Sequence, residues 1–210
     1  MLVVAPMALL GAACLPTPPP WVGDGPHVVV FGDSQTYALE HGPGLDDGNQ
    51  FSFLTDDLVA DGYAASVSAL IGAETGDLAK VVPKIPEPGA DIMLIALGSN
   101  DMRVDADAET SSVPLATAIE HVTTAAEQVG AGCTIVVTIA ETAPWGLDRS
   151  APGFNQALRS IPGVVVADWA PLVQANPHYV GEDGVHQTEA GVAAYRNLFH
   201  EAIGSCGATL

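Results

Sequence analysis

The sequence predicts an α/β protein: a three-layer α/β/α sandwich around a flavodoxin-like parallel five-stranded sheet with strand order 2-1-3-4-5. Three observations favour this fold. Four short runs are apolar throughout, stretches of helical periodicity lie between them, and 210 residues suffice for one α/β domain with a full core. Strands that alternate with helices form right-handed βαβ units, so we expect one layered domain without internal repeats.

Each apolar run is predicted to be a strand that is buried on both faces, because its residues do not alternate with polar ones. The four runs are residues 27–31 (HVVVF), 92–97 (IMLIAL), 134–140 (TIVVTIA) and 164–167 (VVVA). A fifth strand is predicted over residues 64–70 (AASVSAL), where the alternation indicates a more exposed position.

Helices are predicted where apolar residues recur at helical spacing between these strands. The predicted helices cover residues 51–59, 112–130, 154–158 and 188–203. Ser112 and Thr188 are predicted N-caps, Pro114 lies in the first turn of the second helix, and Gly130 ends that helix.

The charge balance excludes two classes of partner. The chain carries 25 acidic and 6 basic side chains, which gives a formal net charge of −19. Binding of nucleic acid needs a basic face, and so does a polybasic contact with a membrane surface. Apolar residues make up 48% of the chain, which excludes a disordered protein.

The N-terminal residues resemble an export signal. Residues 1–13 (MLVVAPMALLGAA) form an apolar run that is too short to span a bilayer, and Cys14 follows it as in a bacterial lipoprotein. Residues 15–26 are rich in proline and are predicted to be an extended, unpacked linker. We therefore expect a signal or lipoprotein-like segment with its linker over 1–26, a domain over 27–210, and a secreted or envelope location. The alternative is a disordered apolar tail or a wrongly assigned start.

Two further cysteines are placed where they can meet. Cys133 opens a predicted strand and Cys206 follows the last predicted helix. Helices in this fold run antiparallel to the strands, so a strand start and a helix end share one edge. The sequence allows a disulfide there, and two separate buried thiols are the alternative. No CxxC pattern or metal-ligand spacing is present, so neither a metal site nor a cofactor is predicted.

Polar groups follow the predicted strands at the edge where sites gather in parallel sheets. They lie in residues 32–34 (GDS), 71–75 (IGAET), 98–101 (GSND) and 183–186 (DGVH). Each segment alone is ordinary turn composition. Together they supply a serine, backbone amides, an asparagine and an Asp–His pair, which are the parts that ester hydrolysis by a serine requires.

Each of these residues has a predicted role. Ser34 is the candidate nucleophile, His186 the general base, and Asp183 the carboxylate that orients the imidazole. The amides of Ser34 and Gly72 and the side chain of Asn100 are the candidate oxyanion donors. Beside them, Asp33 is expected to bond loop amides next to the nucleophile, and Trp145 is a candidate substrate contact.

These blocks resemble those of the SGNH hydrolases, the GDSL esterase/lipase superfamily, over residues 27–203. Gly32-Asp33-Ser34 is similar to the first block, with Gln35 in place of the leucine of the family's name. Gly72, residues 98–101 and residues 183–186 are similar to the other three blocks. The resemblance implies a triad of Ser34, His186 and Asp183, and oxyanion donors at Ser34, Gly72 and Asn100, without metal.

The predicted function is a serine esterase that hydrolyses short-chain acyl esters of a small molecule or a glycan through an acyl-enzyme on Ser34. One alternative is an O-acyltransferase that uses the same triad to move acetyl groups onto an envelope glycan. Another is a non-catalytic carbohydrate-binding module, because a fold does not fix a function. The sequence does not determine the oligomeric state.

Overall fold

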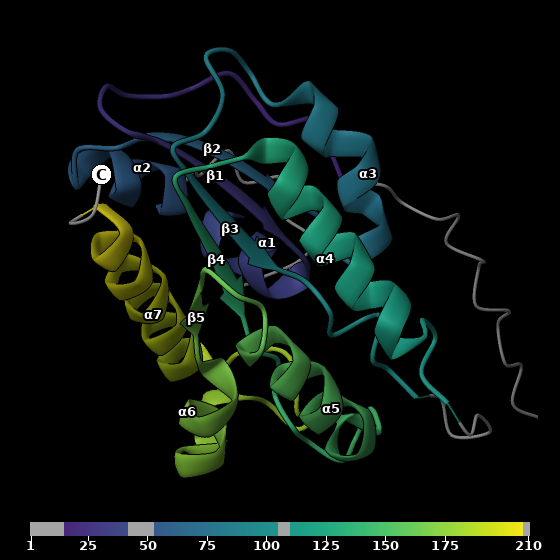
Figure 1. The fold of residues 1–210 in the computed structure, drawn as a ribbon. Coiled ribbons are helices and arrows are strands. Elements are labelled where there is room, and N and C mark those ends of the chain that lie inside the picture. The colour runs from purple at the N-terminus through teal and green to yellow at the C-terminus, as the bar shows by residue number, and fades with distance from the viewer. Residues whose placement is uncertain (1–14, 42–52, 105–109, 208–210) are drawn as a thin grey trace, which may run out of the picture.

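The computed structural model describes residues 15–41, 53–104 and 110–207. Its centre is a parallel five-stranded sheet with the order β2-β1-β3-β4-β5 (Figure 1). The strands are β1 (His27–Gly32), β2 (Ala64–Ala69), β3 (Ile92–Ala96), β4 (Cys133–Val137) and β5 (Val164–Ala167). The predicted fold class and strand order are confirmed.

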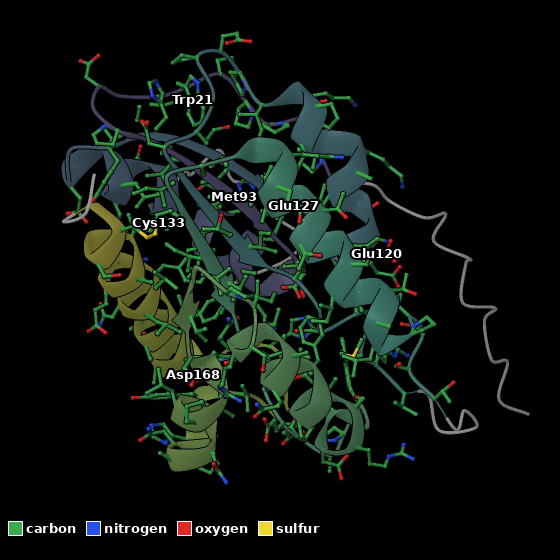
Figure 2. The ribbon with its side chains drawn as sticks, in the orientation of Figure 1. Trp21, Met93, Glu120, Glu127, Cys133 and Asp168 are labelled. Carbon is green, nitrogen blue, oxygen red and sulfur yellow. A yellow bond between two sulfur atoms is a disulfide. The ribbon has the colours of Figure 1, made fainter. Side chains whose placement is uncertain are left out.

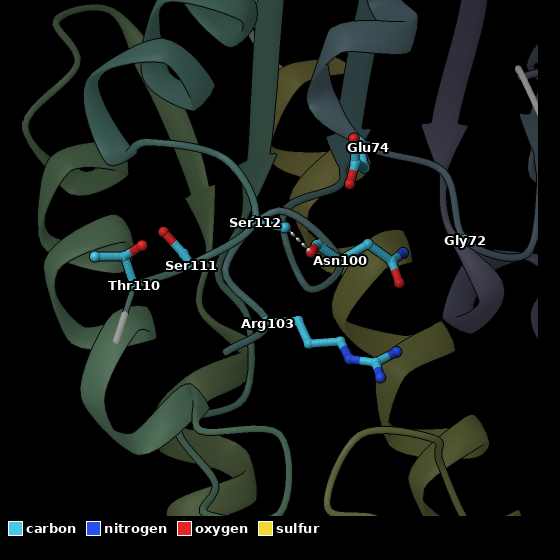
Figure 3. A pocket seen from close by; sticks show the side chains of 7 residues that line it. All are labelled: Gly72, Glu74, Asn100, Arg103, Thr110, Ser111 and Ser112. Atoms are coloured by element: carbon cyan, nitrogen blue, oxygen red, sulfur yellow. Dashed lines mark hydrogen bonds between the residues drawn. The ribbon is translucent and has the colours of Figure 1, made fainter. Parts of the chain in front are cut away.

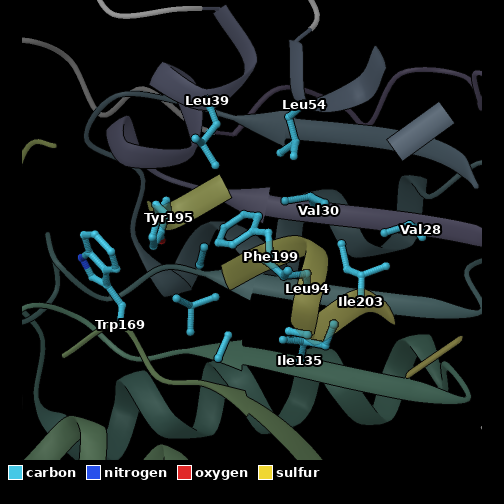
Figure 4. Packing of buried hydrophobic residues seen from close by; sticks show 14 of the residues in the cluster. Val28, Val30, Leu39, Leu54, Leu94, Ile135, Trp169, Tyr195, Phe199 and Ile203 are labelled. Atoms are coloured by element: carbon cyan, nitrogen blue, oxygen red, sulfur yellow. The ribbon is translucent and has the colours of Figure 1, made fainter. Parts of the chain in front are cut away.

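Helices cover both faces of the sheet, and alternate residues of β1 divide the core between them. Val28 and Val30 pack toward α1, α2, α6 and α7 (Figure 4), whereas Val29 and Phe31 pack toward α3, α4 and α5. The helices are α1 (Ser34–His41), α2 (Phe53–Ala60), α3 (Leu78–Val81), α4 (Leu115–Val129), α5 (Leu147–Arg159), α6 (Trp169–Ala175) and α7 (Glu189–Gly207). Short 3₁₀ turns flank α3 at Thr75–Asp77 and Val82–Lys84, and a third follows α6 at Pro177–Tyr179.

Helix ends follow the predicted signals in part. Gly130 ends α4 with a φ of +60°, and the Thr188 hydroxyl accepts a hydrogen bond from the Gly191 amide in the first turn of α7. Pro114, not Ser112, is the N-cap of α4. The Ser112 hydroxyl instead donates to the carbonyl of Asn100, which lies in a loop of the candidate site.

Strand β2 is more buried than its alternation predicts, and the proline-rich segment before β1 is the reason. All six residues of β2 are buried. The hydroxyls of Ser66 and Ser68 donate to the carbonyls of Pro19 and Pro16 at 2.7 and 2.6 Å. Leu15, at 4% exposure, is part of the core.

The expected unpacked linker is therefore wrong for the residues that lie against β2. These residues lie along β2, which is an edge strand, and bond to it. Residues 1–14, with Cys14, lie outside the described residues, so the predicted export segment stays a prediction. Among the helices of the described ranges, none is long and apolar enough to cross a membrane.

A disulfide joins the start of β4 to the end of α7 and confirms that Cys133 and Cys206 meet (Figure 2). Their Cα atoms are 5.8 Å apart and the bond closes a loop of 73 residues. It fastens α7, the helix that follows the His186 segment, to β4, an interior strand of the sheet.

Reduction of this disulfide is expected to lower the free energy of unfolding by about 4 kcal/mol, because a closed loop of this length restricts the unfolded chain. Denaturant unfolding with and without a thiol reductant measures the difference. The variant in which both Cys133 and Cys206 are replaced by alanine serves as the control, because reductant should leave its stability unchanged. Equal stability of the oxidised and reduced wild-type protein would contradict the prediction.

Candidate active site

Ser34 is the first residue of α1, and Asp33 alone separates it from the end of β1. The residue is 4% exposed, and its hydroxyl is 2.9 Å from Nε2 of His186, 152 residues further along the chain. Parallel strands bring their carboxyl ends to one edge, so the loop before α7 reaches the end of β1. The structure therefore brings together the predicted nucleophile and the predicted base.

Asp183 completes a continuous row of side chains. Its Oδ2 is 2.5 Å from Nδ1 of His186. An ionised carboxylate only accepts hydrogen bonds, so Nδ1 of the imidazole carries the proton. Nε2 is then left as an acceptor facing the hydroxyl of Ser34. This arrangement allows a proton to pass from the serine to the imidazole.

The loop that carries Asp183 and His186 is fixed by its own backbone. Oδ1 of Asp183 accepts the amide hydrogens of Val185 and His186 at 2.9 and 3.0 Å. Gly184 has a φ of +72°, and a Cβ there would lie 2.9 Å from the hydroxyl of Thr142, which donates to the Gly184 carbonyl. Only glycine suits this turn, which sets the spacing between the carboxylate and the imidazole.

The pKa of Asp183 reflects two opposing effects. Burial acts to raise it, but the hydrogen bonds from the His186 side chain and from the amides of Val185 and His186 outweigh burial. The pKa of Asp183 therefore lies below its ordinary value, and the carboxylate stays ionised at neutral pH. An ionised Asp183 is the form that orients the imidazole and stabilises it when it becomes protonated.

The two predicted oxyanion segments are also held against each other. The side-chain NH₂ of Asn100 donates to the carbonyl of Ala73, the residue after Gly72, at 2.9 Å. A side-chain NH₂ has a second hydrogen, which this bond does not use. Gly72 has a φ of +80°, so its turn alone accounts for a glycine at this position.

A buried network behind these segments was not found from the sequence. Asp101, fully buried, accepts hydrogen bonds from the amide of Thr75 at 3.1 Å and from its hydroxyl at 2.5 Å. The same hydroxyl is 3.0 Å from Nδ1 of His121 on α4. The hydroxyl gives its one hydrogen to Asp101, so Nδ1 of His121 donates to it. The network fixes the Gly72 segment to the Asn100 loop.

An open pocket of about 550 Å³ lies beside Gly72 and Asn100 (Figure 3). Its lining residues are Gly72, Glu74, Asn100, Arg103, Thr110, Ser111 and Ser112. Hydroxyl, amide and charged groups dominate this lining, so the pocket suits a polar ligand better than a long hydrocarbon chain.

Trp145 links the pocket to the imidazole. Its ring meets the ring of His186 edge to face, with centroids 5.7 Å apart, and the guanidinium of Arg103 lies 5.1 Å from the centroid of the tryptophan. Trp145 therefore lies next to the base, as expected for a wall of the substrate site, and its contact with substrate stays a prediction. Within the described ranges, no group of three or more His, Cys, Asp or Glu side chains is arranged to hold a metal ion.

The match to a family model decides the relationship of this chain to known proteins. The model of the GDSL-like lipase/acylhydrolase family matches residues 30–194. The chain belongs to this family. The match extends from β1 into α7 and includes all four segments of the candidate site. Membership supports an acyl ester hydrolase.

Solved structures with the same fold include several esterases. An acetyl-xylooligosaccharide esterase from Geobacillus stearothermophilus superposes with a TM-score of 0.68 at 18% identity, over 87% of this chain and 96% of its own. A lipase/acylhydrolase from Enterococcus faecalis gives 0.64 at 20% identity, over 83% and 93%. A putative acylhydrolase from Bacteroides fragilis gives 0.62 at 17% identity, over 91% of each chain. No curated protein matches the sequence.

Asp33, in the first block of this GDSL-like chain, is buried beside Ser34. Its Oδ1 accepts the amide hydrogen of Gln35 at 2.9 Å, in line with its expected role in the loop. Burial raises the pKa of Asp33 to about 6, although the Gln35 amide, the charge of His186 and the Ser99 hydroxyl act to lower it. The carboxyl is therefore neutral in mild acid and ionised above pH 6.

The raised pKa predicts a dependence of stability on pH. The pKa in the folded protein exceeds the ordinary 3.8, so Asp33 favours folding below about pH 4 and loses that contribution as the pH rises through 6. The loss amounts to roughly 3 kcal/mol, at about 1.4 kcal/mol for each pKa unit.

The variant Asp33→Asn keeps the acceptor for the Gln35 amide and removes the charge. Its free energy of unfolding should therefore fall less than that of the wild type between about pH 4 and about pH 8. Urea denaturation of both proteins measures the two slopes, and other titrating groups contribute equally to each. Identical slopes would show that Asp33 does not titrate in this range.

Proposed function

We propose that this protein is a serine esterase that hydrolyses short-chain carboxylic esters through an acyl-enzyme on Ser34. The observation that carries the proposal is the continuous row of hydrogen bonds from Asp183 through His186 to Ser34. Membership in the GDSL-like acylhydrolase family supports the same chemistry.

The first half of the reaction forms the acyl-enzyme. Nε2 of His186 takes the hydroxyl proton as Oγ of Ser34 attacks the ester carbon. The π electrons of the carbonyl move to its oxygen, which becomes an oxyanion. The imidazolium, held by Asp183, then gives this proton to the alkoxide of the leaving alcohol as the C–O bond breaks. The alcohol departs and the acyl group stays on Ser34.

The oxyanion needs donors that are already in place. We assign this role to the amides of Ser34 and Gly72 and to the second N–H of the Asn100 side chain. The bond from Asn100 to Ala73 and the network around Asp101 support the assignment, because they fix these segments before substrate binds. One such donor typically contributes about 10²- to 10³-fold to kcat.

The second half of the reaction reverses the roles. Water enters where the alcohol left, and His186 takes a proton from it as the oxygen attacks the acyl carbon. The proton returns to Oγ of Ser34 as the acyl–serine bond breaks, and a carboxylic acid is released. The half-exposed His186 side chain is accessible to this water, at 36% exposure.

We further propose that the alcohol part of the substrate is a carbohydrate. The pocket beside Asn100 offers hydroxyl, amide and charged groups of the kind that bind sugar hydroxyls. Two esterases with the same fold are named for acetylated xylan or its oligosaccharides. The polar lining also supports a short acyl group.

We also propose that the protein works outside the cytoplasm, as a secreted or envelope-bound enzyme. The disulfide between Cys133 and Cys206 supports this location, because such bonds persist in oxidising compartments.

A chain-length profile tests the proposed function. Aryl esters from acetate to palmitate are assayed with the purified protein, and kcat/KM is expected to be highest for acetate and to fall steeply with chain length. An acetylated oligosaccharide and an added glycan acceptor extend the assay. A preference for palmitate would contradict the short acyl group, and transfer of acetyl to the acceptor in place of acetate release would indicate an acyltransferase.

A further inference from the structure

Gln35 occupies a buried position at the centre of the candidate site. It follows Ser34 directly and is 3% exposed. It occupies the position of the leucine in the GDSL motif. Its side-chain NH₂ donates to Oγ of Ser99 at 2.9 Å, and its Oε1 accepts from the side-chain NH₂ of Gln187 at 3.2 Å. A leucine would fill a similar volume but would make neither hydrogen bond.

The two partners of Gln35 belong to the other functional segments. Ser99 precedes Asn100, the candidate oxyanion donor, and Gln187 follows His186, the candidate base. The Ser99 hydroxyl also acts to lower the pKa of the neighbouring Asp33 carboxyl. The two bonds therefore run in one direction, from Gln187 through Gln35, the residue after Ser34, to Ser99.

A buried polar row of this kind favours a single arrangement of the segments that it joins. Each donor faces one acceptor, and a shift of any loop leaves a buried polar group without a partner. Three segments that are distant in sequence, at Ser34, Asn100 and His186, are joined by this row. Hydrogen bonds that the Asp183 carboxylate accepts from backbone amides fix the turn around His186, but they do not connect it to the loop of Ser34.

We propose that Gln35 is a positioning residue that holds His186 and Asn100 in place relative to Ser34. The inference rests on the proposed function, because it concerns the same reaction. It assigns to this chain a polar connection that leucine cannot supply. Gln35 acts through Ser99 and Gln187 and does not contact the reacting atoms itself.

Double-mutant kinetics test the role. The variants are Gln35→Leu, Gln187→Leu and the double variant, and Gln128→Leu on the exposed face of α4 is the matched control. Each single change at the site is expected to lower kcat on an aryl acetate about tenfold, with KM unchanged within about twofold. The double variant is expected to lose about tenfold and not a hundredfold, because both changes remove the same bond.

Thermal unfolding of every variant separates positioning from folding. Gln35→Leu leaves the Ser99 hydroxyl and the Gln187 side chain without a partner, so a modest fall in its melting temperature is expected. A lower kcat, measured at a temperature at which every variant is fully folded, supports positioning. If Gln35→Leu does not fold, Gln187→Leu carries the test alone. Wild-type kcat in the folded variants, or additive losses, would overturn the inference and leave the proposed function intact. An inactive wild-type protein would overturn both.

Discussion

Replacement of Ser34 by alanine is expected to lower kcat on an aryl acetate by about 10⁴- to 10⁶-fold, because it removes the hydroxyl that receives the acyl group in the proposed reaction. The hydroxyl of Ser34 is the atom that faces Nε2 of His186, at 2.9 Å. The remaining activity would come from direct attack of water on the ester, with the oxyanion stabilised by the same donors. Initial rates with purified protein measure the loss.

The fold should survive this change. Alanine removes one hydroxyl, and the partner that loses its bond, His186, is partly exposed and can bond to water. The free energy of unfolding is therefore expected to change by less than about 1.5 kcal/mol. Ser160→Ala, at an exposed position after α5, is the matched control and should keep full activity. A folded Ser34→Ala protein with near wild-type turnover would remove the mechanism.

Covalent labelling gives an independent measurement. A fluorophosphonate reacts with a serine hydroxyl that a base activates, so the wild-type protein should gain one adduct on the peptide that contains Ser34. Ser34→Ala should gain none, and Ser160→Ala should be labelled as fast as wild type. An adduct on another serine would assign the nucleophile to that residue.

The fold was predictable where burial on both faces leaves a continuous apolar run. Residues 164–167 form β5 as predicted, and the observed strand order is the flavodoxin-like order that was expected. Helix α1 gives no such signal, because its buried residues include Ser34, Gln35 and Thr36. These residues are polar, so the sequence shows no helical periodicity of apolar residues there. The packing of the proline-rich segment on β2 also has no local sequence signal, because it depends on hydrogen bonds between residues that are 47 and 52 positions apart.

The site was predictable to the extent that strand ends converge. The positions of Ser34, Asp183 and His186 followed from that rule, and their side chains meet. Thr75 and His121 were not found, because their role depends on Asp101, which lies in another loop. A sequence motif identifies the candidate catalytic residues. The residues that position them are identified only by contacts in the folded structure.

Replacement of Asp183 by asparagine is expected to lower kcat by about 10⁴-fold at neutral pH, because it changes the tautomer of His186. Oδ1 of Asp183 accepts two backbone amides, of Val185 and His186, so the asparagine oxygen is expected to stay there. Its NH₂ group then faces Nδ1 of His186 and requires that nitrogen to accept. The proton moves to Nε2, which can no longer take the hydroxyl proton of Ser34.

The variant isolates this effect because asparagine has the size and the backbone bonds of the aspartate. KM should remain within about twofold of wild type, since the loss is in proton transfer and not in binding. Asp148→Asn, in the exposed first turn of α5, is the control and should be fully active. The double variant with Ser34→Ala should be no slower than Ser34→Ala alone, because the base has no serine left to activate. A loss below about tenfold in Asp183→Asn would mean that His186 finds its working tautomer without this carboxylate.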